Sequence, residues 1–195
     1  MTVDKLTVRK EFKVYEMIID QVRAQRGSVV ISPGAAKIES GAAGRAYVDT
    51  DNGRLPISVI VGDKLRCQQN NGRNSKYLVV NVTSVSSDYF DYTVIDGTGS
   101  LAAGDEVVVF GSDDPTRQGI IYITSSDDGA PYMDVLDSVN SASLAGKTRL
   151  RVGKLSGISG QSGYGIWGSQ NGVDTDFVIS SAGYASIAGR YWAII

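Results

Sequence analysis

Apolar and polar residues alternate along much of this 195-residue chain, beginning near its start. Residues 6–15 carry apolar side chains at every second position except Lys10, the period of a strand with one buried face. Residues 15–26 fit a strand or a short helix, and we favour the strand because Gly27 and the β-branched run 29–31 follow. Residues 1–43 are therefore expected to form an N-terminal β segment.

The glycine-rich residues 40–44 have the composition of a linker, which predicts a boundary near residue 43. Beyond it, two similar phrases, residues 61–67 and 103–109, each place a Gly-Asp turn before a strand. Short strands joined by tight turns predict that residues 44–112 form a small OB-like or SH3-like barrel or a sandwich. The expected strands are 55–60, 64–69, 76–85, 89–95 and 105–110.

The pattern changes after Pro115. Two apolar runs, residues 119–124 and 131–136, flank a turn-rich segment and predict a β-hairpin within residues 113–142. Short apolar pieces then alternate with glycine through residues 143–195. We expect an extended, glycine-rich, fibre-like tail there, so the fold class predicted for the whole chain is all-β.

The apolar side chains of this tail have few neighbours in the sequence that could cover them. One isolated strand cannot bury its own apolar face, so we expect other copies of the chain to do so. These considerations permit a dimer or a trimer. The side chains expected to need such burial are Ile158, Ile166, Trp167, Phe177, Val178, Ile179, Ile187 and Trp192.

Aromatic residues of the tail are candidates for contacts of two kinds. Rigid aromatic rings serve well in contacts with a receptor or a carbohydrate. They serve equally in packing between chains, which is the favoured interpretation. These candidate contact residues are Tyr164, Trp167, Tyr184, Tyr191 and Trp192.

Composition narrows the possible partners and locations. The chain has 19 basic and 21 acidic residues without blocks of one sign, so no electrostatic footprint for nucleic acid or an anionic membrane is present. No apolar stretch approaches the length of a membrane span, and residues 1–11 lack the core of a signal peptide. Cys67 is the only cysteine; it is expected to be a buried core thiol in a protein folded in a reducing cytoplasm.

Candidate chemistry is sparse. The chain has no histidine, which excludes Ser-His-Asp and Cys-His catalysis, and it lacks a phosphate-binding loop and a thiolate zinc site. We therefore predict no catalytic, cofactor or metal site. Asp127 and Asp128 are interpreted as turn formers, and Asp134 and Asp137 as residues on the solvated side of a strand. Residues 49–53 start like a calcium loop but lack its glutamate, so a hairpin turn is predicted there.

Five phrases of the chain occur in a characteristic order, at residues 6–19, 117–124, 130–137, 143–158 and 162–167. Taken together, they resemble tail proteins of phages and prophages of Bacteroidetes. The resemblance implies a tail-tip or central-fibre segment that joins the hub to the distal fibre, is homotrimeric and contacts other tail proteins. It also implies assembly into the virion after synthesis in the host cytoplasm. The chain is short for this group, and its apolar end, residues 190–195, suggests a longer polypeptide.

Three functions are compatible with these observations. The favoured one is a virion structural protein, without enzymatic activity. The second is a receptor-binding module that recognises a host surface glycan or protein, suggested by the tail aromatics. The third is a tail-associated polysaccharide-degrading enzyme, which only the clusters of carboxylate side chains support.

Overall fold

The computed structural model describes residues 27–51, 53–70 and 75–187. Regular structure in these ranges is β-strand apart from one turn of 3-10 helix, η1 (Pro115–Arg117), so the all-β prediction is confirmed. The strands expected within residues 6–26 lie outside the described residues. Within the described ranges, no helix has the length and apolar character needed to cross a membrane.

Six strands form a closed antiparallel barrel in the order β2-β3-β6-β5-β4-β7. Irregular register between β2 and β3, between β4 and β7, and between β5 and β6 marks bulges, which bend strands and help a sheet to close. The strands are β2 (Ala35–Ala42), β3 (Arg45–Val48), β4 (Asp63–Asn70), β5 (Ser75–Val85), β6 (Tyr89–Gly97) and β7 (Glu106–Ser112).

Two expectations about the barrel are wrong. Residues 55–60 form no strand and instead belong to the long connection from β3 to β4. Residues 40–44 are not a linker, because they form the end of β2 and the turn into β3. Gly41 lies so close to the backbone of Leu101 that a Cβ would clash there, so this glycine serves packing rather than flexibility. A barrel strand therefore precedes residue 43.

The barrel interior is apolar and fully enclosed. Ile38, Leu65, Leu78 and Phe90 are at most 1% exposed and belong to one cluster that draws on the wall strands. Cys67 is buried in the same cluster, as predicted, and burial raises the pKa of its thiol to about 11.

The Gly-Asp repeat corresponds to a repeated structure. Gly62 and Gly104 both have positive φ, which glycine adopts readily. The buried carboxylate of Asp63 accepts the backbone N–H of Ile60, and that of Asp105 accepts the backbone N–H of Ala102. Each aspartate thus closes a tight turn at the entrance to a barrel strand.

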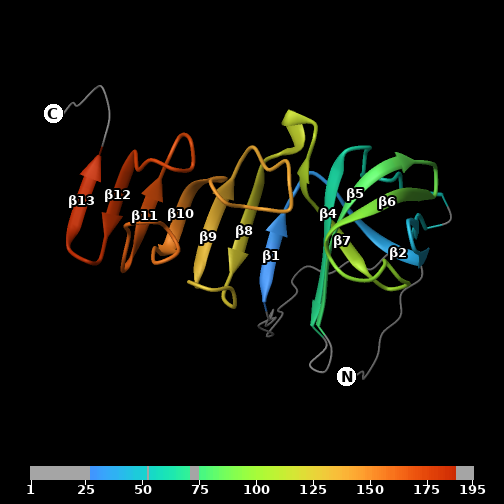
Figure 1. Ribbon diagram of the computed structural model, residues 1–195, viewed down its shortest axis with the longest axis horizontal. Helices are drawn as coiled ribbons and strands as arrows, with labels where there is room; N and C mark the ends of the chain where they lie inside the picture. Colours follow the sequence, from blue (N-terminus) through green and yellow to red (C-terminus); the bar gives the residue numbers. More distant parts are fainter. Residues whose placement is uncertain (1–26, 52, 71–74, 188–195) are drawn as a thin grey trace, which may run out of the picture.

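The other seven strands form an antiparallel sheet in the order β1-β8-β9-β10-β11-β12-β13. They lie side by side along the longest axis of the molecule, and the barrel follows beyond the β1 end (Figure 1). The expected hairpin is formed by β8 and β9. The strands are β1 (Ser28–Ile31), β8 (Ile120–Thr124), β9 (Tyr132–Leu136), β10 (Thr148–Lys154), β11 (Tyr164–Gly168), β12 (Phe177–Ser180) and β13 (Tyr184–Ile187).

One face of this sheet is covered by the chain itself. Tyr122 and Leu136 pack under Val139, and Trp167 and Val178 pack under Leu155, so two small cores form along the face. The expectation that Trp167 and Val178 require other copies is therefore wrong, since each is 1% exposed. The loops between the tail strands supply the cover that the sequence pattern did not reveal.

A buried ion pair completes the covered face. Arg151 donates two hydrogen bonds to Asp134, both of 2.7 Å, and Thr148 donates a third of 3.2 Å. Asp134 is 3% exposed, which corrects its expected place on the solvated side of the strand. The carboxylate lies opposite Arg151 in the register of β9 and β10, so the strands bring the two charges together.

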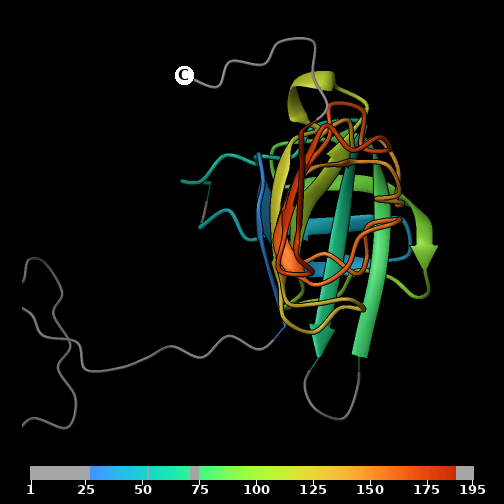
Figure 2. The same cartoon turned by 90° about the vertical axis from the view of Figure 1, so that its left-hand side faces the viewer.

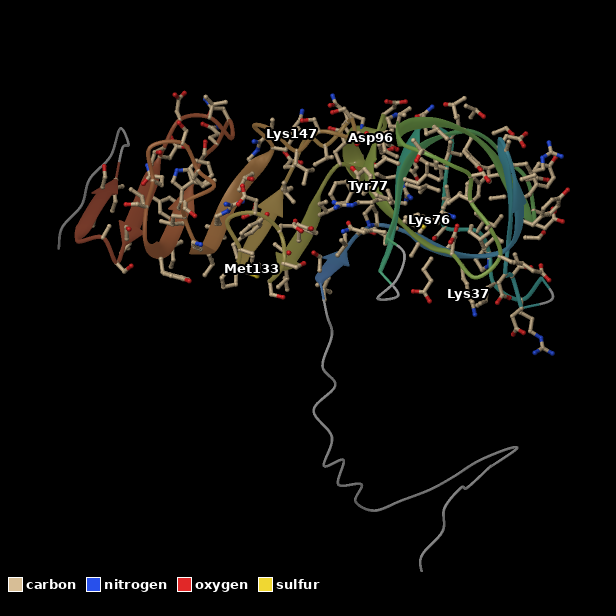
Figure 3. All side chains as sticks on the ribbon, turned by 60° about the horizontal axis from the view of Figure 1, so that its bottom comes forward. Lys37, Lys76, Tyr77, Asp96, Met133 and Lys147 are labelled. Atoms are coloured by element: carbon tan, nitrogen blue, oxygen red, sulfur yellow. The ribbon has the colours of Figure 1, made fainter. Side chains whose placement is uncertain are left out.

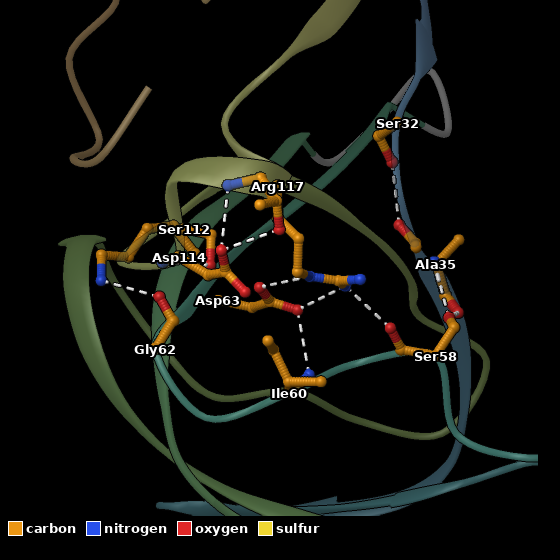
Figure 4. Close-up of polar contacts among 12 residues, drawn as sticks. Ser32, Ala35, Ser58, Ile60, Gly62, Asp63, Ser112, Asp114 and Arg117 are labelled. Atoms are coloured by element: carbon orange, nitrogen blue, oxygen red, sulfur yellow. Dashed lines mark hydrogen bonds and ion pairs between the residues drawn. The ribbon is translucent and has the colours of Figure 1, made fainter. Parts of the chain in front are cut away.

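Barrel and sheet meet at a junction that combines ionic and aromatic contacts. Arg117 of η1 donates to both carboxylate oxygens of Asp63, at 3.1 and 2.8 Å, and to the carbonyl oxygen of Ser58 (Figure 4). Phe110 of barrel strand β7 packs edge-on against Tyr122 of sheet strand β8, with ring centroids 6.1 Å apart. Hydrogen bonds to the carboxylate raise the pKa of Arg117, so the guanidinium stays charged.

Candidate functional site

The second face of the seven-stranded sheet carries only apolar residues at its central positions. In an antiparallel sheet, residues paired directly across neighbouring strands point to the same face. Following the pairs from β1 to β13 gives two complete rows on this face, which we call the apolar face. The first row is Val29, Ile123, Met133, Val152, Ile166, Ile179 and Ala185, and the second is Ile31, Ile121, Val135, Leu150, Gly168, Phe177 and Ile187.

Side chains of the apolar face are accessible to solvent in the single chain. Val29, Ile123, Val152 and Ile166 are 36–41% exposed, and Ile179 is 56% exposed. Isolated apolar residues on a surface need no explanation, but an uninterrupted stripe over seven strands does. A contiguous apolar surface of this extent is typical of an interface.

The views of the molecule agree with this two-sided arrangement. Seen along the long axis, the sheet lies toward one side, and the loops that connect its strands lie toward the other (Figure 2). Met133 lies along one border of the sheet and Lys147 along the opposite border (Figure 3).

The predicted contact aromatics divide between the two faces. Tyr164 is 53% exposed and pairs with Lys154 at the border of the apolar face. Trp167 is instead buried on the covered face, where its indole N–H donates to Thr175, so it is not available to a receptor. Tyr184 begins β13, opposite Ser180. Tyr191 and Trp192 lie outside the described residues.

The tail residues predicted to need other copies also divide. Ile166, Ile179 and Ile187 are 40–56% exposed on the apolar face, as the interchain hypothesis requires. Phe177 belongs to the same face and is half-buried. Ile158 packs against the core of Leu155 and Trp167 and so is covered within the chain.

The carboxylates that the sequence brings into clusters form hydrogen bonds and an ion pair within the fold. Asp127 accepts a hydrogen bond from the Tyr122 hydroxyl, which helps burial to raise the pKa of that phenol. Asp134 is held by Arg151, and the backbone N–H of Asp51 donates to Asp49 in a surface turn. That turn does not connect paired strands, so the hairpin predicted for residues 49–53 is wrong. In the described part of the chain, no group of three or more potential metal ligands occurs.

A cavity of about 390 Å³ lies where the barrel meets β1 and β8. Its lining includes Arg66, Gln68, Glu106 and Tyr122, so it offers both donors and acceptors. The Arg66 guanidinium lies over the ring of Phe110 at 4.7 Å and donates to Gln68, but its buried Nε has no hydrogen-bond partner. The cavity therefore places a buried, unpaired donor beside other polar side chains.

Sequence reasoning anticipated some exposed side chains of the apolar face, namely Ile166, Ile179 and Ile187, but neither the continuous face nor the cavity. The apolar face depends on the register of six strand pairs, and a one-residue shift in any pair would move a row to the other side. The cavity depends on the approach of β1 to the barrel. Comparison of the chain with protein-family models, with curated proteins and with solved structures found no match.

Proposed function

We propose that the chain is a structural, non-enzymatic segment of a bacteriophage tail, located in the tail tip or central fibre between the hub and the distal fibre. The resemblance of five of its segments to Bacteroidetes phage tail proteins supports this position. The single observation that carries the structural role is the apolar face, because it requires burial in an assembly.

The shape of the molecule suits such a segment. A closed barrel at one end provides a self-contained body, and the sheet continues from it as a row of short rungs (Figure 1). Within this proposal, the barrel is the OB-like or SH3-like module and the sheet is the fibre-like part. The partners are further copies of the chain, with a trimer favoured, and other tail proteins at the two ends.

The proposal is tested on virions of the phage that encodes the chain. A gold-labelled antibody against the purified protein should bind at the distal end of the tail in electron micrographs. Virions produced without the gene serve as the control and should remain unlabelled. Label on the capsid, or wild-type virions in which the protein cannot be detected, would contradict the assignment.

A receptor-binding module is the second candidate, and the cavity beside Arg66 is the observation that favours it. A guanidinium with a free, buried Nε, together with Gln68 and Glu106, could bind the hydroxyl groups of a saccharide. An array of host surface glycans tests this function. Binding that disappears in Arg66→Leu would support it, whereas absence of binding leaves the structural proposal alone.

A further inference from the structure

We propose that the cavity beside Arg66 binds a carboxylate-bearing saccharide, such as a uronic acid, and that the guanidinium pairs with the carboxylate. The inference goes beyond the structural role of the chain. It rests on the second candidate function, for which it names the class of ligand. Three features of the cavity support it: the unpaired charge of Arg66, the opposing charge of Glu106 and the remaining polar lining.

Arg66 differs from the other arginines in the described ranges because it has no carboxylate partner there. Each of the other five forms an ion pair with an aspartate. A half-buried guanidinium has lost part of its hydration, so its charge is costly without a counter-charge. The buried Nε of Arg66 also lacks an acceptor. An anionic group of a ligand in the cavity would supply the missing counter-charge.

Three aromatic rings hold the Arg66 guanidinium in place. Its Cζ lies 4.7 Å from the ring centroid of Phe110, 5.3 Å from that of Tyr77 and 5.7 Å from that of Tyr122. Contact with aromatic rings stabilises a cation without neutralising its charge. The side chain is therefore positioned before a ligand arrives, which lowers the entropic cost of binding.

Glu106 restricts the kind of anion that the cavity accepts. Its exposed carboxylate lines the same cavity and forms no ion pair with Arg66. Phosphate or sulfate brings negative charge and mostly acceptor oxygens, so Glu106 would repel it. A sugar acid carries one charge and several hydroxyl groups, so its carboxylate can face Arg66 while a hydroxyl donates to Glu106. The opposed charges therefore favour an acidic sugar over an inorganic anion.

The remaining lining of the cavity suits a saccharide better than an acidic peptide. Ser28 and Ser126 contribute hydroxyl groups and Gln68 an amide, and all three can donate and accept hydrogen bonds. A carboxylate side chain of a peptide would leave these groups unused, whereas sugar hydroxyls match them. The volume of about 390 Å³ lies within the usual range of small-ligand pockets, about 300–1,000 Å³.

The place of the cavity in the fold also suits a binding site. Strands β4 and β7 supply its barrel side, and β1 and β8 supply its sheet side. The edge-on contact between Phe110 and Tyr122 holds these two sides together. Ligand sites are common at such boundaries between structural units. Because Gln68 and Glu106 are exposed, a ligand can enter from solvent on their side.

Titration of the full chain with glucuronate or galacturonate, followed by calorimetry and nuclear magnetic resonance, tests the inference. Glucose and galactose are the matched neutral probes, because they carry a hydroxymethyl group in place of the carboxylate. We expect each acid to bind at least about tenfold more tightly than its neutral counterpart, since a charge-assisted hydrogen bond is lost in the latter. Failure of both acids to bind would overturn the site. Equal affinities for acid and neutral sugar would overturn the pairing with the carboxylate.

A matched pair of arginine variants locates the binding. Arg66→Gln removes the charge from the cavity. Arg45→Gln makes the same change at a barrel arginine that lies 4.1 Å from the ring centroid of Tyr89 but pairs with Asp91 and does not line the cavity. We expect Arg66→Gln to weaken uronic acid binding about tenfold or more, and Arg45→Gln to leave it unchanged. Equal affinities of the two variants would overturn the assignment to Arg66.

A variant expected to strengthen binding protects the test against simple misfolding. Glu106→Gln removes the opposing charge at an exposed position and keeps an acceptor for sugar hydroxyls. It should bind the uronic acids more tightly than the native chain does, with the affinity for glucose unchanged. Circular dichroism of all three variants should match that of the native chain. Weaker binding of the acids by a folded Glu106→Gln would contradict the selection of a single charge.

Other ligands separate the saccharide from its alternatives. Inorganic phosphate or a short acidic peptide that binds as tightly as the uronic acids would overturn the saccharide as the ligand. Binding of neutral sugars alone, abolished in Arg66→Gln, would keep the receptor-binding module and overturn the acidic ligand. The test on virions is independent: distal labelling of the tail by a chain that binds no sugar would leave the structural role intact and remove this site.

Discussion

The barrel and the seven-stranded sheet are both antiparallel, yet they differ in how completely they bury their apolar side chains. In the barrel, the inner face of every strand meets the others inside a closed wall, so Ile38 and Phe90 lose contact with water in a single copy. In the sheet, loops cover one face, and the other face leaves Ile166 and Ile179 exposed. Closure gives the barrel an independent core, whereas one face of the sheet remains open to solvent in a single chain.

The buried ion pair of the sheet should produce the largest effect on stability. In Asp134→Asn the side chain keeps its shape but loses its charge, which leaves the buried guanidinium of Arg151 unpaired. Removing one partner of such a pair typically destabilises a fold by about 3–5 kcal/mol. We expect a correspondingly lower urea midpoint, followed by circular dichroism.

The matched control is Asp91→Asn on the barrel surface, where the carboxylate binds Arg45 in contact with solvent. Exposed pairs contribute little because water solvates both charges. Its urea midpoint should remain close to that of the native chain. Equal shifts in the two variants would show that Asp134 is not held in a buried pair.

The contrast between the two regions predicts a smaller but still clear difference for one substitution made twice. Ile38→Ala removes a 1% exposed side chain from the barrel core, which should lower the free energy of unfolding by about 2–5 kcal/mol. Ile179→Ala removes a 56% exposed side chain from the apolar face. In dilute monomer it should change the free energy of unfolding by less than about 0.5 kcal/mol.

Protein concentration sharpens this comparison. As concentration rises and copies associate, Ile179→Ala should become more destabilising relative to the native chain, because the side chain then contributes to a buried interface. Ile38→Ala should keep the same effect at every concentration. If the effect of Ile179→Ala on thermal unfolding does not depend on protein concentration, the apolar face is not buried between copies.

The buried Cys67 thiol should have a smaller effect. Its titration at high pH should lower the free energy of unfolding by at most about 2–3 kcal/mol. Burial raises the pKa of Cys67 from 9.0 to about 11, so the unfolded chain releases this proton at lower pH than the folded one. The resulting stabilisation is complete below pH 9 and is lost as pH rises through 11. Unfolding curves should therefore decline less steeply with pH in Cys67→Ala, and identical slopes would contradict the buried environment.

Local sequence patterns predicted the parts of the fold that depend on neighbours in the chain. The β8–β9 hairpin formed because two apolar runs flank a turn, and each Gly-Asp phrase opens a strand because its aspartate caps its own turn. Residues 40–44 were misinterpreted because glycine there permits close contact with Leu101 rather than flexibility. The apolar run 55–60 was misassigned as a strand for a related reason, since composition alone does not reveal which segments find a pairing partner.

The apolar face of the sheet could not be predicted as a continuous surface from local sequence patterns. Trp167 and Ile166 are adjacent in the chain, and alternation places them on opposite faces, but nothing local indicates which face the loops cover. The expectation of exposed apolar side chains in the tail was sound for Ile166, Ile179 and Ile187. It failed for Trp167 and Val178, because a loop more than ten residues away carries Leu155 over them.

Distances between spin labels test the central claim most directly. A label introduced by Ile179→Cys lies on the apolar face, and a label introduced by Val173→Cys serves as the control; Cys67 is buried and its thiol stays protonated at neutral pH. Packed sheets lie about 10 Å apart, so labels at position 179 in three copies should approach within about 20 Å of one another. Labels at position 173 should give clearly longer distances. Distances at position 179 that equal or exceed those at position 173, or no coupling between copies, would contradict the account.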